Sequence, residues 1–152
     1  MNREKAKKFL QLAKYQAELF SKDPNRKVAT ILLSKDTLNI LSTGYNGLPR
    51  GMNDDNEERW VRPTKYWYVT HSEINSICSA ARNGTKVDGA IAVVTMFPCS
   101  DCAKALIQAG VKTIVSITPN IDESKWGEHF KISLEMFEEL GIELILFDPS
   151  DI

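Results

Sequence analysis

The amino-acid sequence predicts a three-layer α/β/α domain around one five-stranded mixed sheet. An amphipathic segment opens the chain, two short apolar runs follow it, and further apolar runs then alternate with helical patterns. This alternation is typical of α/β folds, in which helices cover both faces of a sheet. A helix-length segment separates the last two apolar runs, so a tight hairpin cannot join them. We therefore expect the last two strands to be parallel, with a right-handed crossover.

The first part of the chain predicts a helix, a hairpin and a long loop. Asn2 to Phe20 is expected to be helical because apolar residues recur there at spacings of three or four, at Ala6, Phe9, Ala13, Ala17 and Phe20. Val28 to Ser34 and Leu38 to Thr43 are expected to pair as the hairpin. Gly44 to Thr70 is irregular and contains several glycines and prolines. A loop of this length in a compact domain usually forms or covers a functional site.

The second part of the chain predicts three helices that alternate with three strands. The expected helices are His71 to Asn83, Pro98 to Ala109 and Trp126 to Leu140, and a glycine follows each of them as a cap. The expected strands are Ala90 to Met96, Val111 to Ile117 and Ile142 to Phe147. The first of these is apolar almost throughout, which indicates a central buried strand. The last helix is expected to face the core through Ile132, Met136, Phe137 and Leu140.

Composition limits the size and surroundings of this domain. A chain of 152 residues with 43% hydrophobic residues fits a single domain, residues 1–152. Its 19 Lys and Arg against 20 Asp and Glu give a net charge of -1, which excludes a strongly basic protein that coats nucleic acid. A local basic pocket for a phosphorylated ligand remains compatible with that charge. No apolar run approaches the ~20 residues of a membrane helix, and Met1 to Lys8 is unlike a signal segment, so we expect a cytoplasmic protein.

The strongest chemical signal joins His71-Ser72-Glu73 to Pro98-Cys99-Ser100-Asp101-Cys102. Cys99 and Cys102 are three residues apart at a predicted helix start, so both thiols point to one side. The helix N-terminus favours their thiolate forms, which bind metals. With His71 at a second helix start, they supply three ligands for one zinc ion. The fourth position then stays open for water, which is typical of catalytic zinc sites.

Glu73 is the candidate catalytic residue beside this metal site. It lies two residues from His71 and therefore cannot easily share the same metal bond. Its carboxylate can instead reach water at the metal and move protons to and from it, as a general acid and base does.

Other interpretations of these residues stay open. Cys99 and Cys102 alone could form a redox pair, and a structural zinc site would need a fourth ligand. Cys78 could supply that ligand, although its apolar helical surroundings favour a buried core residue. His129 is expected to be a surface residue, because nothing pairs with it in the sequence.

These motifs together resemble the cytidine deaminase superfamily, and within it the deoxycytidylate (dCMP) deaminases. His-x-Glu followed by Pro-Cys-x-x-Cys is the signature of zinc-dependent nucleobase deaminases. The Gly-Tyr-Asn-Gly sequence narrows the resemblance to the branch that uses nucleotides. The likeness covers nearly the whole chain from about Ala6, through Ser21-Lys22-Asp23-Pro24, Lys27-Val28, Gly44 to Gly51, His71 to Asn75, Phe97 to Lys104, Gln108 to Lys112 and Phe137 to Ile142.

The resemblance implies a cytidine-deaminase-like fold and hydrolytic deamination of dCMP to dUMP and ammonia, which supplies dUMP for thymidylate synthesis. His71, Cys99 and Cys102 would hold one Zn²⁺ per subunit, and Glu73 would be catalytic. An arginine fork suits a phosphate, so Arg26 is the best candidate for the 5′-phosphate contact, with Lys22, Lys27 and Arg50 as rivals. The other implied substrate-binding residues are Asn46, Ser72, Phe97 and Pro98. Phe97 could equally be a core residue.

The resemblance also implies allosteric control in a homo-oligomer. Many relatives are hexamers that dCTP activates and dTTP inhibits at a separate site between subunits, and Mg²⁺ would accompany the allosteric nucleotide. The residues implied for that site are Gly44, Tyr45, Asn46, Gly47, Lys22 and Arg50. The alternative is that the glycines only permit a tight turn.

The chain departs from the family pattern at two positions. Ser72 stands where alanine is usual, and Ile121 lies near the place where some relatives have an aromatic residue that covers the base. The sequence therefore does not identify which residue stacks on the base. Gly51 to Thr70 contains no Cys or His, so we expect no second, structural zinc.

Two other functions stay open alongside deamination of dCMP. The first is a polynucleotide cytidine or adenosine deaminase, which the net charge of -1 disfavours. The second is a non-catalytic subunit that senses dCTP and dTTP, which the presence of Glu73 disfavours. We expect free nucleotides as partners, and neither a nucleic-acid polymer nor a membrane.

Overall fold

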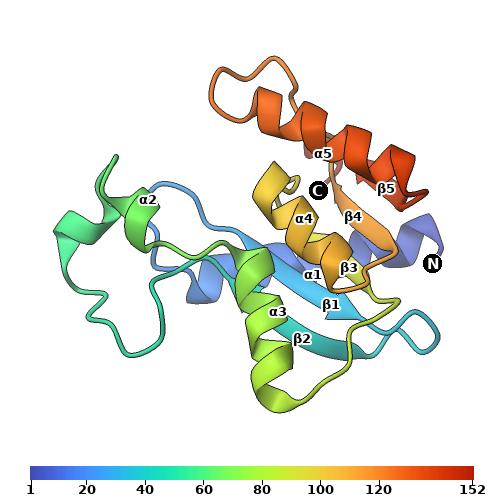
Figure 1. The fold of residues 1–152 in the computed structure, drawn as a ribbon, viewed down its shortest axis with the longest axis horizontal. Coiled ribbons are helices and arrows are strands. Elements are labelled where there is room, and N and C mark those ends of the chain that lie inside the picture. The colour runs from blue at the N-terminus through green and yellow to red at the C-terminus, as the bar shows by residue number, and fades with distance from the viewer.

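The computed structural model describes all residues, Met1–Ile152 (Figure 1). Its α-helices are α1 (Arg3–Phe20), α2 (Lys65–Tyr68), α3 (Ser72–Asn83), α4 (Ser100–Gln108) and α5 (Gly127–Glu139). Its strands are β1 (Ala29–Leu33), β2 (Ile40–Tyr45), β3 (Ile91–Val94), β4 (Thr113–Ile117) and β5 (Glu143–Phe147). Two 3-10 helices, η1 (Glu57–Trp60) and η2 (Pro149–Asp151), complete the structure. Every predicted helix and strand is present, and each of their ends lies within two residues of the predicted position.

The five strands form one mixed sheet in the order β2-β1-β3-β4-β5. β1 pairs antiparallel with both β2 and β3. β3, β4 and β5 are parallel, and Thr113–Ile117 pairs in register with Glu143–Phe147. The prediction that the last two strands are parallel is therefore confirmed.

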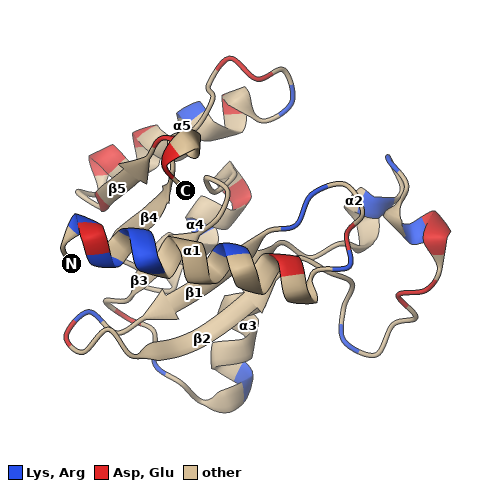
Figure 2. Cartoon of the chain, turned by 180° about the vertical axis from the view of Figure 1, so that it is seen from behind, with Lys and Arg blue, Asp and Glu red and all other residues tan.

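Helices cover both faces of the sheet, which confirms the three-layer architecture. α1 lies across one face (Figure 2), where Ala6, Leu10 and Ala13 pack against strand residues such as Ile31 and Val93. α3, α4 and α5 lie on the other face, and a second core cluster there joins strand residues to those of α4 and α5. Successive strand residues point to opposite faces, so β1, β3 and β4 contribute buried residues to both clusters.

The segment from residue 46 to residue 70, here called the outer loop, extends away from the sheet (Figure 1). It contains η1 and α2, and an isolated bridge between Gly47 and Thr70 joins its two ends. The predicted irregular loop is thus partly helical, and its first two predicted residues, Gly44 and Tyr45, belong to β2 instead. Those two residues continue the β2 ladder opposite Thr30 and Ala29.

Gly44 is the point at which α3 approaches β2 most closely. A Cβ atom at Gly44 would lie 2.4 Å from both the Ser72 carbonyl oxygen and the Ser76 amide nitrogen. Both neighbours are backbone atoms, so one element would have to move. The glycine is therefore required by packing, and not by a turn.

Gly44→Ala should lower the free energy of unfolding by about 1–3 kcal/mol, because the added methyl group overpacks the contact between β2 and α3. Urea denaturation followed by fluorescence measures this change. Gly47→Ala is the matched control, since nothing lies within 4 Å of a Cβ atom there; it should stay within about 0.5 kcal/mol. Equal effects of the two substitutions would contradict the packing argument.

The buried face of α5 differs from the prediction. Phe137 is buried as expected, but Ile132 and Leu140 are 40% and 53% exposed. The face that packs inward consists of Phe130, Ser133 and Phe137. The polar Ser133 interrupts the apolar pattern because its hydroxyl donates to the Pro98 carbonyl oxygen, at 2.9 Å. Because the buried face includes a hydrogen-bonded serine, the spacing of apolar residues alone does not identify that face.

Cys78 is exposed, so its prediction as a buried core residue is wrong. The inner face of α3 is formed by small or polar residues, Ser72, Glu73, Ser76 and Ala80. The close contact with Gly44 explains this composition, since large apolar side chains would not fit between α3 and β2. None of the helices, α3 included, is both long enough and apolar enough to span a membrane.

Candidate functional site

Three helix N-termini meet on one side of the molecule and form a cavity. α4 and α5 each follow a strand of the parallel set, so both helices start at the carboxyl edge of the sheet, where α/β proteins bind ligands. α3 begins beside them. The cavity has a volume of about 370 Å³, and its lining includes residues from the start of each helix, such as Glu73, Cys99 and Trp126.

His71, Cys99 and Cys102 form a candidate metal site, because their one nitrogen and two sulfur atoms lie close enough together to hold an ion. The His71 Nδ1 atom lies 3.6 Å from the Cys99 Sγ atom and 3.3 Å from the Cys102 Sγ atom. Tetrahedral zinc, with bonds of about 2.3 Å to sulfur and 2.0 Å to nitrogen, separates two such ligands by about 3.5 Å. The residues therefore fit zinc. His71 and Cys99 are N-caps that make no side-chain capping bond, which leaves both side chains for the metal.

The two thiols influence each other's protonation. Hydrogen bonds from Cys102 and then from His71 lower the pKa of Cys99 to about 4. The pKa of Cys102 is raised, because its thiol hydrogen-bonds to Cys99 and is buried. The lowered pKa favours the thiolate form of Cys99, which is the form that binds metals. Cys78 lies outside this group, so it does not close the site with a fourth ligand.

Glu73 is buried beside the metal site, at 4% exposure. Burial raises the pKa of its carboxyl group above the ordinary value. The Ser72 hydroxyl donates to Glu73 Oε2 at 3.1 Å, and the same hydroxyl lies 2.7 Å from the Thr30 Oγ1 atom in β1. The hydroxyl of Ser72, which an alanine would lack, thus links Glu73 to the sheet.

Trp126 and His129 form an aromatic wall of the cavity beside His71. The Trp126 ring meets the His71 ring edge-on, with centroids 5.9 Å apart, and lies 5.4 Å from the His129 ring. His129 Nδ1 lies 2.8 Å from the Ser100 Oγ atom. His129 therefore lines the cavity, and its prediction as an unpaired surface residue is wrong. The bond to Ser100, from the neighbouring helix, is a tertiary contact that the sequence did not indicate.

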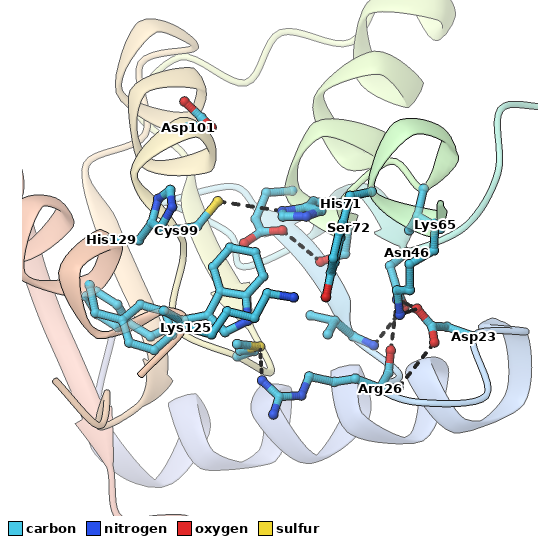
Figure 3. A pocket seen from close by; sticks show the side chains of 18 of the residues that line it. Asp23, Arg26, Asn46, Lys65, His71, Ser72, Cys99, Asp101, Lys125 and His129 are labelled. Carbon is cyan, nitrogen blue, oxygen red and sulfur yellow. Dashed lines mark hydrogen bonds and ion pairs between the residues drawn. The ribbon is translucent and has the colours of Figure 1, made fainter. Parts of the chain in front are cut away.

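Cations line the cavity away from the metal site. Arg26, Arg62 and Lys125 line it and form no ion pair, and Figure 3 places Arg26 across the pocket from His71 and Cys99. The Lys125 Nζ atom lies 3.6 Å from the centroid of the Tyr66 ring. Desolvation, together with the charges of Arg62, Lys65 and Arg26, lowers the pKa of Lys125. These cations are thus close enough to repel one another, and an anion between them would relieve that repulsion.

Lys65 differs from the other cations because it is buried and paired with Asp23 at 2.6 Å. Burial works to raise the pKa of Asp23. The hydrogen bond and charge of Lys65, with the N–H groups of Asn25 and Arg26, outweigh burial, so the pKa of Asp23 lies below its usual range.

The structure brings most of the predicted substrate residues to the cavity. Arg26, Asn46, Ser72 and Phe97 line it, whereas Pro98 does not. Phe97 also belongs to the core, where it packs edge-to-face on Phe130 and Phe137. The Asn46 side chain accepts hydrogen bonds from the Ser21 hydroxyl and the Val28 N–H and donates to Asp23 and to the Arg26 carbonyl oxygen. All its hydrogen-bonding capacity is thus used within the protein.

The residues predicted for a regulatory site are divided between the interior and the surface. Gly44 and Asn46 are buried, whereas Tyr45 is 38% exposed and stacks on Phe20. Lys22 pairs with Asp54 on the surface, and Arg50 donates to the Ser79 hydroxyl. Neither Lys22 nor Arg50 lines the cavity of the metal site.

Sequence reasoning missed several residues of the cavity. These residues are Asp23, Arg62, Lys65, Tyr66, Val69, Asp101, Lys125 and Trp126. Two signals pointed to some of them. The outer loop, which supplies Arg62, Lys65, Tyr66 and Val69, was already expected to form or cover a site. Parallel strands also place the helices that follow them at one edge, so the start of α5 had to lie near the start of α4.

Comparisons with known proteins agree with this geometry. A family model described as the cytidine and deoxycytidylate deaminase zinc-binding region matches residues 3–118. Human deoxycytidylate deaminase is 39% identical over 135 residues, which cover 85% of this chain and 72% of the relative. An uncharacterized deaminase from the luxG 3′ region of Aliivibrio fischeri is 35% identical over 150 residues, covering 97% of this chain and 95% of the relative.

A solved structure shares the whole fold. The dCMP deaminase of cyanophage S-TIM5, crystallised in complex with dCMP and dUMP, superposes with a TM-score of 0.76 at 25% identity. The match covers 97% of this chain and 99% of the phage protein. Because the family match runs through both His71 and the Cys99–Cys102 pair, at the positions that the structure brings together, the chain belongs to the cytidine and deoxycytidylate deaminase family.

Proposed function

We propose that this protein is a zinc-dependent deaminase that converts dCMP and water to dUMP and ammonia. One observation supports this most directly: the metal ligands, the buried Glu73 and three unpaired cations line the same cavity of about 370 Å³. A nucleobase at the metal end would leave the 5′-phosphate near the cations. The relatives named deoxycytidylate deaminase add support.

His71, Cys99 and Cys102 would hold the zinc ion, which acidifies water and so supplies the nucleophile. Glu73 would take a proton from the attacking water at its carboxylate and deliver it to N3 of cytosine. It would later pass a proton to the departing amino group, which leaves as ammonia. A carboxyl group whose pKa is raised by burial is suited to both accepting and returning protons.

Trp126 would stack on the base, which is the role of an aromatic residue that some relatives have near the position of Ile121. Ile121 is 40% exposed and does not line the cavity, whereas Trp126 lines it beside His71. Ser72 and Phe97 would complete the surroundings of the pyrimidine, and Asn46 would act through the backbone that it holds. Pro98 would contribute indirectly, by tying the chain before Cys99 to Ser133.

Arg62→Ala and Lys125→Ala should each raise the KM for dCMP about 5- to 10-fold, because a charge-assisted hydrogen bond to phosphate is lost. The KM for deoxycytidine, which has no phosphate, should not change. Steady-state kinetics with both substrates measure this. Lys86→Ala, at an exposed lysine remote from the cavity, is the control. An equal rise with deoxycytidine would contradict a phosphate contact.

The product dUMP would supply thymidylate synthesis, and the enzyme would act in the cytoplasm. It would form a homo-oligomer, which the family resemblance suggests to be a hexamer. Activation by dCTP with Mg²⁺ and inhibition by dTTP form part of the proposal. The accessible groups near the Gly-Tyr-Asn-Gly sequence support it, since Tyr45, Lys22 and Arg50 could contact a nucleotide. Gly44, Asn46 and Gly47 would shape the backbone there.

A substrate panel tests the proposed function. Purified zinc-loaded protein is given dCMP, dCTP, deoxycytidine, CMP or a single-stranded oligonucleotide, each with and without dTTP, and deamination is followed by ultraviolet absorbance. Turnover greatest with dCMP supports the proposal. Faster turnover of the oligonucleotide would indicate a polynucleotide deaminase. Binding of dCTP and dTTP without any turnover would indicate a sensing subunit.

A further inference from the structure

One ion pair in the protein is buried, and it joins two segments that are far apart in the sequence. Lys65 Nζ lies 2.6 Å from Asp23 Oδ2, and the two side chains are 7% and 2% exposed. In every other ion pair, both side chains are at least 35% exposed. A buried ion pair is costly to desolvate, so it contributes little to stability compared with apolar residues of the same size. Because both residues line the cavity, the pair is placed to act on ligand binding instead of on stability.

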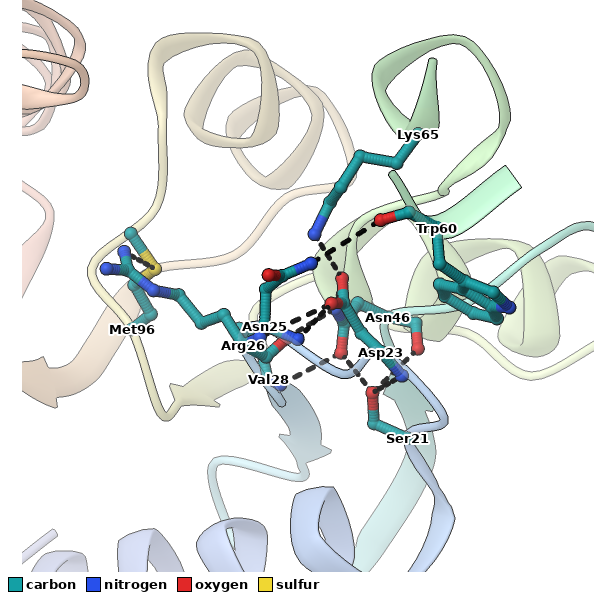
Figure 4. A network of polar contacts seen from close by, with 9 residues as sticks. All are labelled: Ser21, Asp23, Asn25, Arg26, Val28, Asn46, Trp60, Lys65 and Met96. Carbon is teal, nitrogen blue, oxygen red and sulfur yellow. Dashed lines mark hydrogen bonds and ion pairs between the residues drawn. The ribbon is translucent and has the colours of Figure 1, made fainter. Parts of the chain in front are cut away.

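The Asp23 side of this pair holds the backbone of Arg26. Asp23 Oδ1 accepts hydrogen bonds from the N–H groups of Asn25, at 2.8 Å, and Arg26, at 3.3 Å. The Asn46 amide then donates both to Asp23 Oδ2 and to the Arg26 carbonyl oxygen. Figure 4 shows this network between the segment that connects α1 to β1 and the outer loop. The peptide groups on both sides of the Arg26 Cα atom are thus fixed, and its side chain extends to the Met96 sulfur.

The Lys65 side of the pair holds the outer loop. Lys65 opens α2, so the ion pair fixes the helix that follows Arg62 and contains Tyr66. The Tyr66 ring in turn contacts the Lys125 amino group. The ion pair between Lys22 and Asp54 also joins the outer loop to the segment after α1, but it is exposed to solvent and therefore contributes little. The buried pair is consequently the contact best placed to set the positions of all three free cations.

We propose that the Asp23–Lys65 pair is a positioning pair that sets recognition of the substrate's 5′-phosphate by Arg26, Arg62 and Lys125. The proposal rests on the proposed deamination of dCMP. Asp23 neutralises Lys65, so Lys65 acts by holding the loop and not as a phosphate ligand. The pair touches neither the metal ligands nor Glu73, so its effect is confined to the phosphate end of the substrate.

The experiment compares binding of dCMP and deoxycytidine to zinc-loaded protein by calorimetry. A Glu73→Gln background prevents turnover, and every variant is made in it. Lys65→Met should weaken dCMP binding about tenfold or more, while deoxycytidine binding changes less than about twofold. Lys65→Arg keeps the charge and should restore much of the preference for dCMP. Lys86→Met, which breaks the exposed pair with Asp88 outside the cavity, is the matched control and should leave both affinities unchanged.

Lys65→Met leaves Asp23 buried without its partner, which can prevent folding. The double variant Asp23→Asn with Lys65→Met removes both charges, keeps an acceptor for the backbone N–H groups, and should show the same selective loss of dCMP binding. Equal weakening of both ligands would mean a merely structural role and would overturn the inference. Unchanged dCMP binding, or no preference for dCMP before mutation, would overturn it as well. Deamination by protein with Glu73 intact is measured separately, so failure of the proposed function is distinguishable from failure of the positioning role.

Discussion

Replacing Glu73 with glutamine should lower kcat for dCMP about 10²–10⁴-fold, because the amide cannot accept and return the proton. Glutamine keeps the shape of the side chain and can still accept the hydrogen bond from Ser72. Glu73 is not among the three grouped ligands, so zinc content should stay at one ion per chain. Ultraviolet assays give kcat, and atomic absorption gives the zinc content.

Asp101→Asn is the matched control for this experiment. Asp101 lines the same cavity, but its carboxylate is 75% exposed and pairs with Lys104. Its neutralisation should change kcat less than about threefold, since it holds no proton of the reaction. If Glu73→Gln retained full activity, or if Asp101→Asn lost as much, Glu73 would not be the proton carrier.

Loss of a single metal ligand should remove both zinc and activity. Cys102→Ala leaves two ligands, and we expect zinc affinity to fall by well over the roughly 10–100-fold that loss of a residue supporting a ligand costs. Turnover should then drop below detection at stoichiometric zinc, because no acidified water is available. Chelation of the wild-type protein should have the same effect, and added zinc should reverse it.

Cys78→Ala tests whether the third cysteine takes part. Cys78 is exposed and lies outside the metal group, so this variant should keep its zinc and its activity. A loss of zinc in Cys78→Ala, or zinc retained by Cys102→Ala, would require a different ligand set.

Some errors of the sequence analysis share one physical cause. The sequence pattern predicts that Ile132 and Leu140 face the core and that Cys78 is buried, yet all three are exposed. In both helices, polar residues occupy the buried face: Ser133 bonds to Pro98, and Ser76 packs where Gly44 lets α3 approach. Hydrophobic periodicity cannot identify a face that is buried through hydrogen bonds and close backbone contact.

The position of His129 in the cavity likewise could not be predicted from local sequence patterns. No neighbour in the sequence gives it a partner, and only the packing of α5 against α4 brings its ring to Ser100. The grouping of His71, Cys99 and Cys102 follows more directly from the sequence. Cys99 and Cys102 share one helical turn, and the signature includes His71, so their chemistry is encoded at short range.

The order of helices and strands, the parallel pairing of β4 and β5 and the zinc-deaminase motif can all be predicted from the amino-acid sequence. Local spacing and helix-length connections encode these features directly. Only the folded structure shows that the outer loop folds back, which brings Lys65 onto Asp23 and Arg62 near Arg26 and Lys125. Those contacts join residues about 40 to 100 positions apart in the chain. They depend on burial and charge pairing in the folded molecule, which no local pattern records.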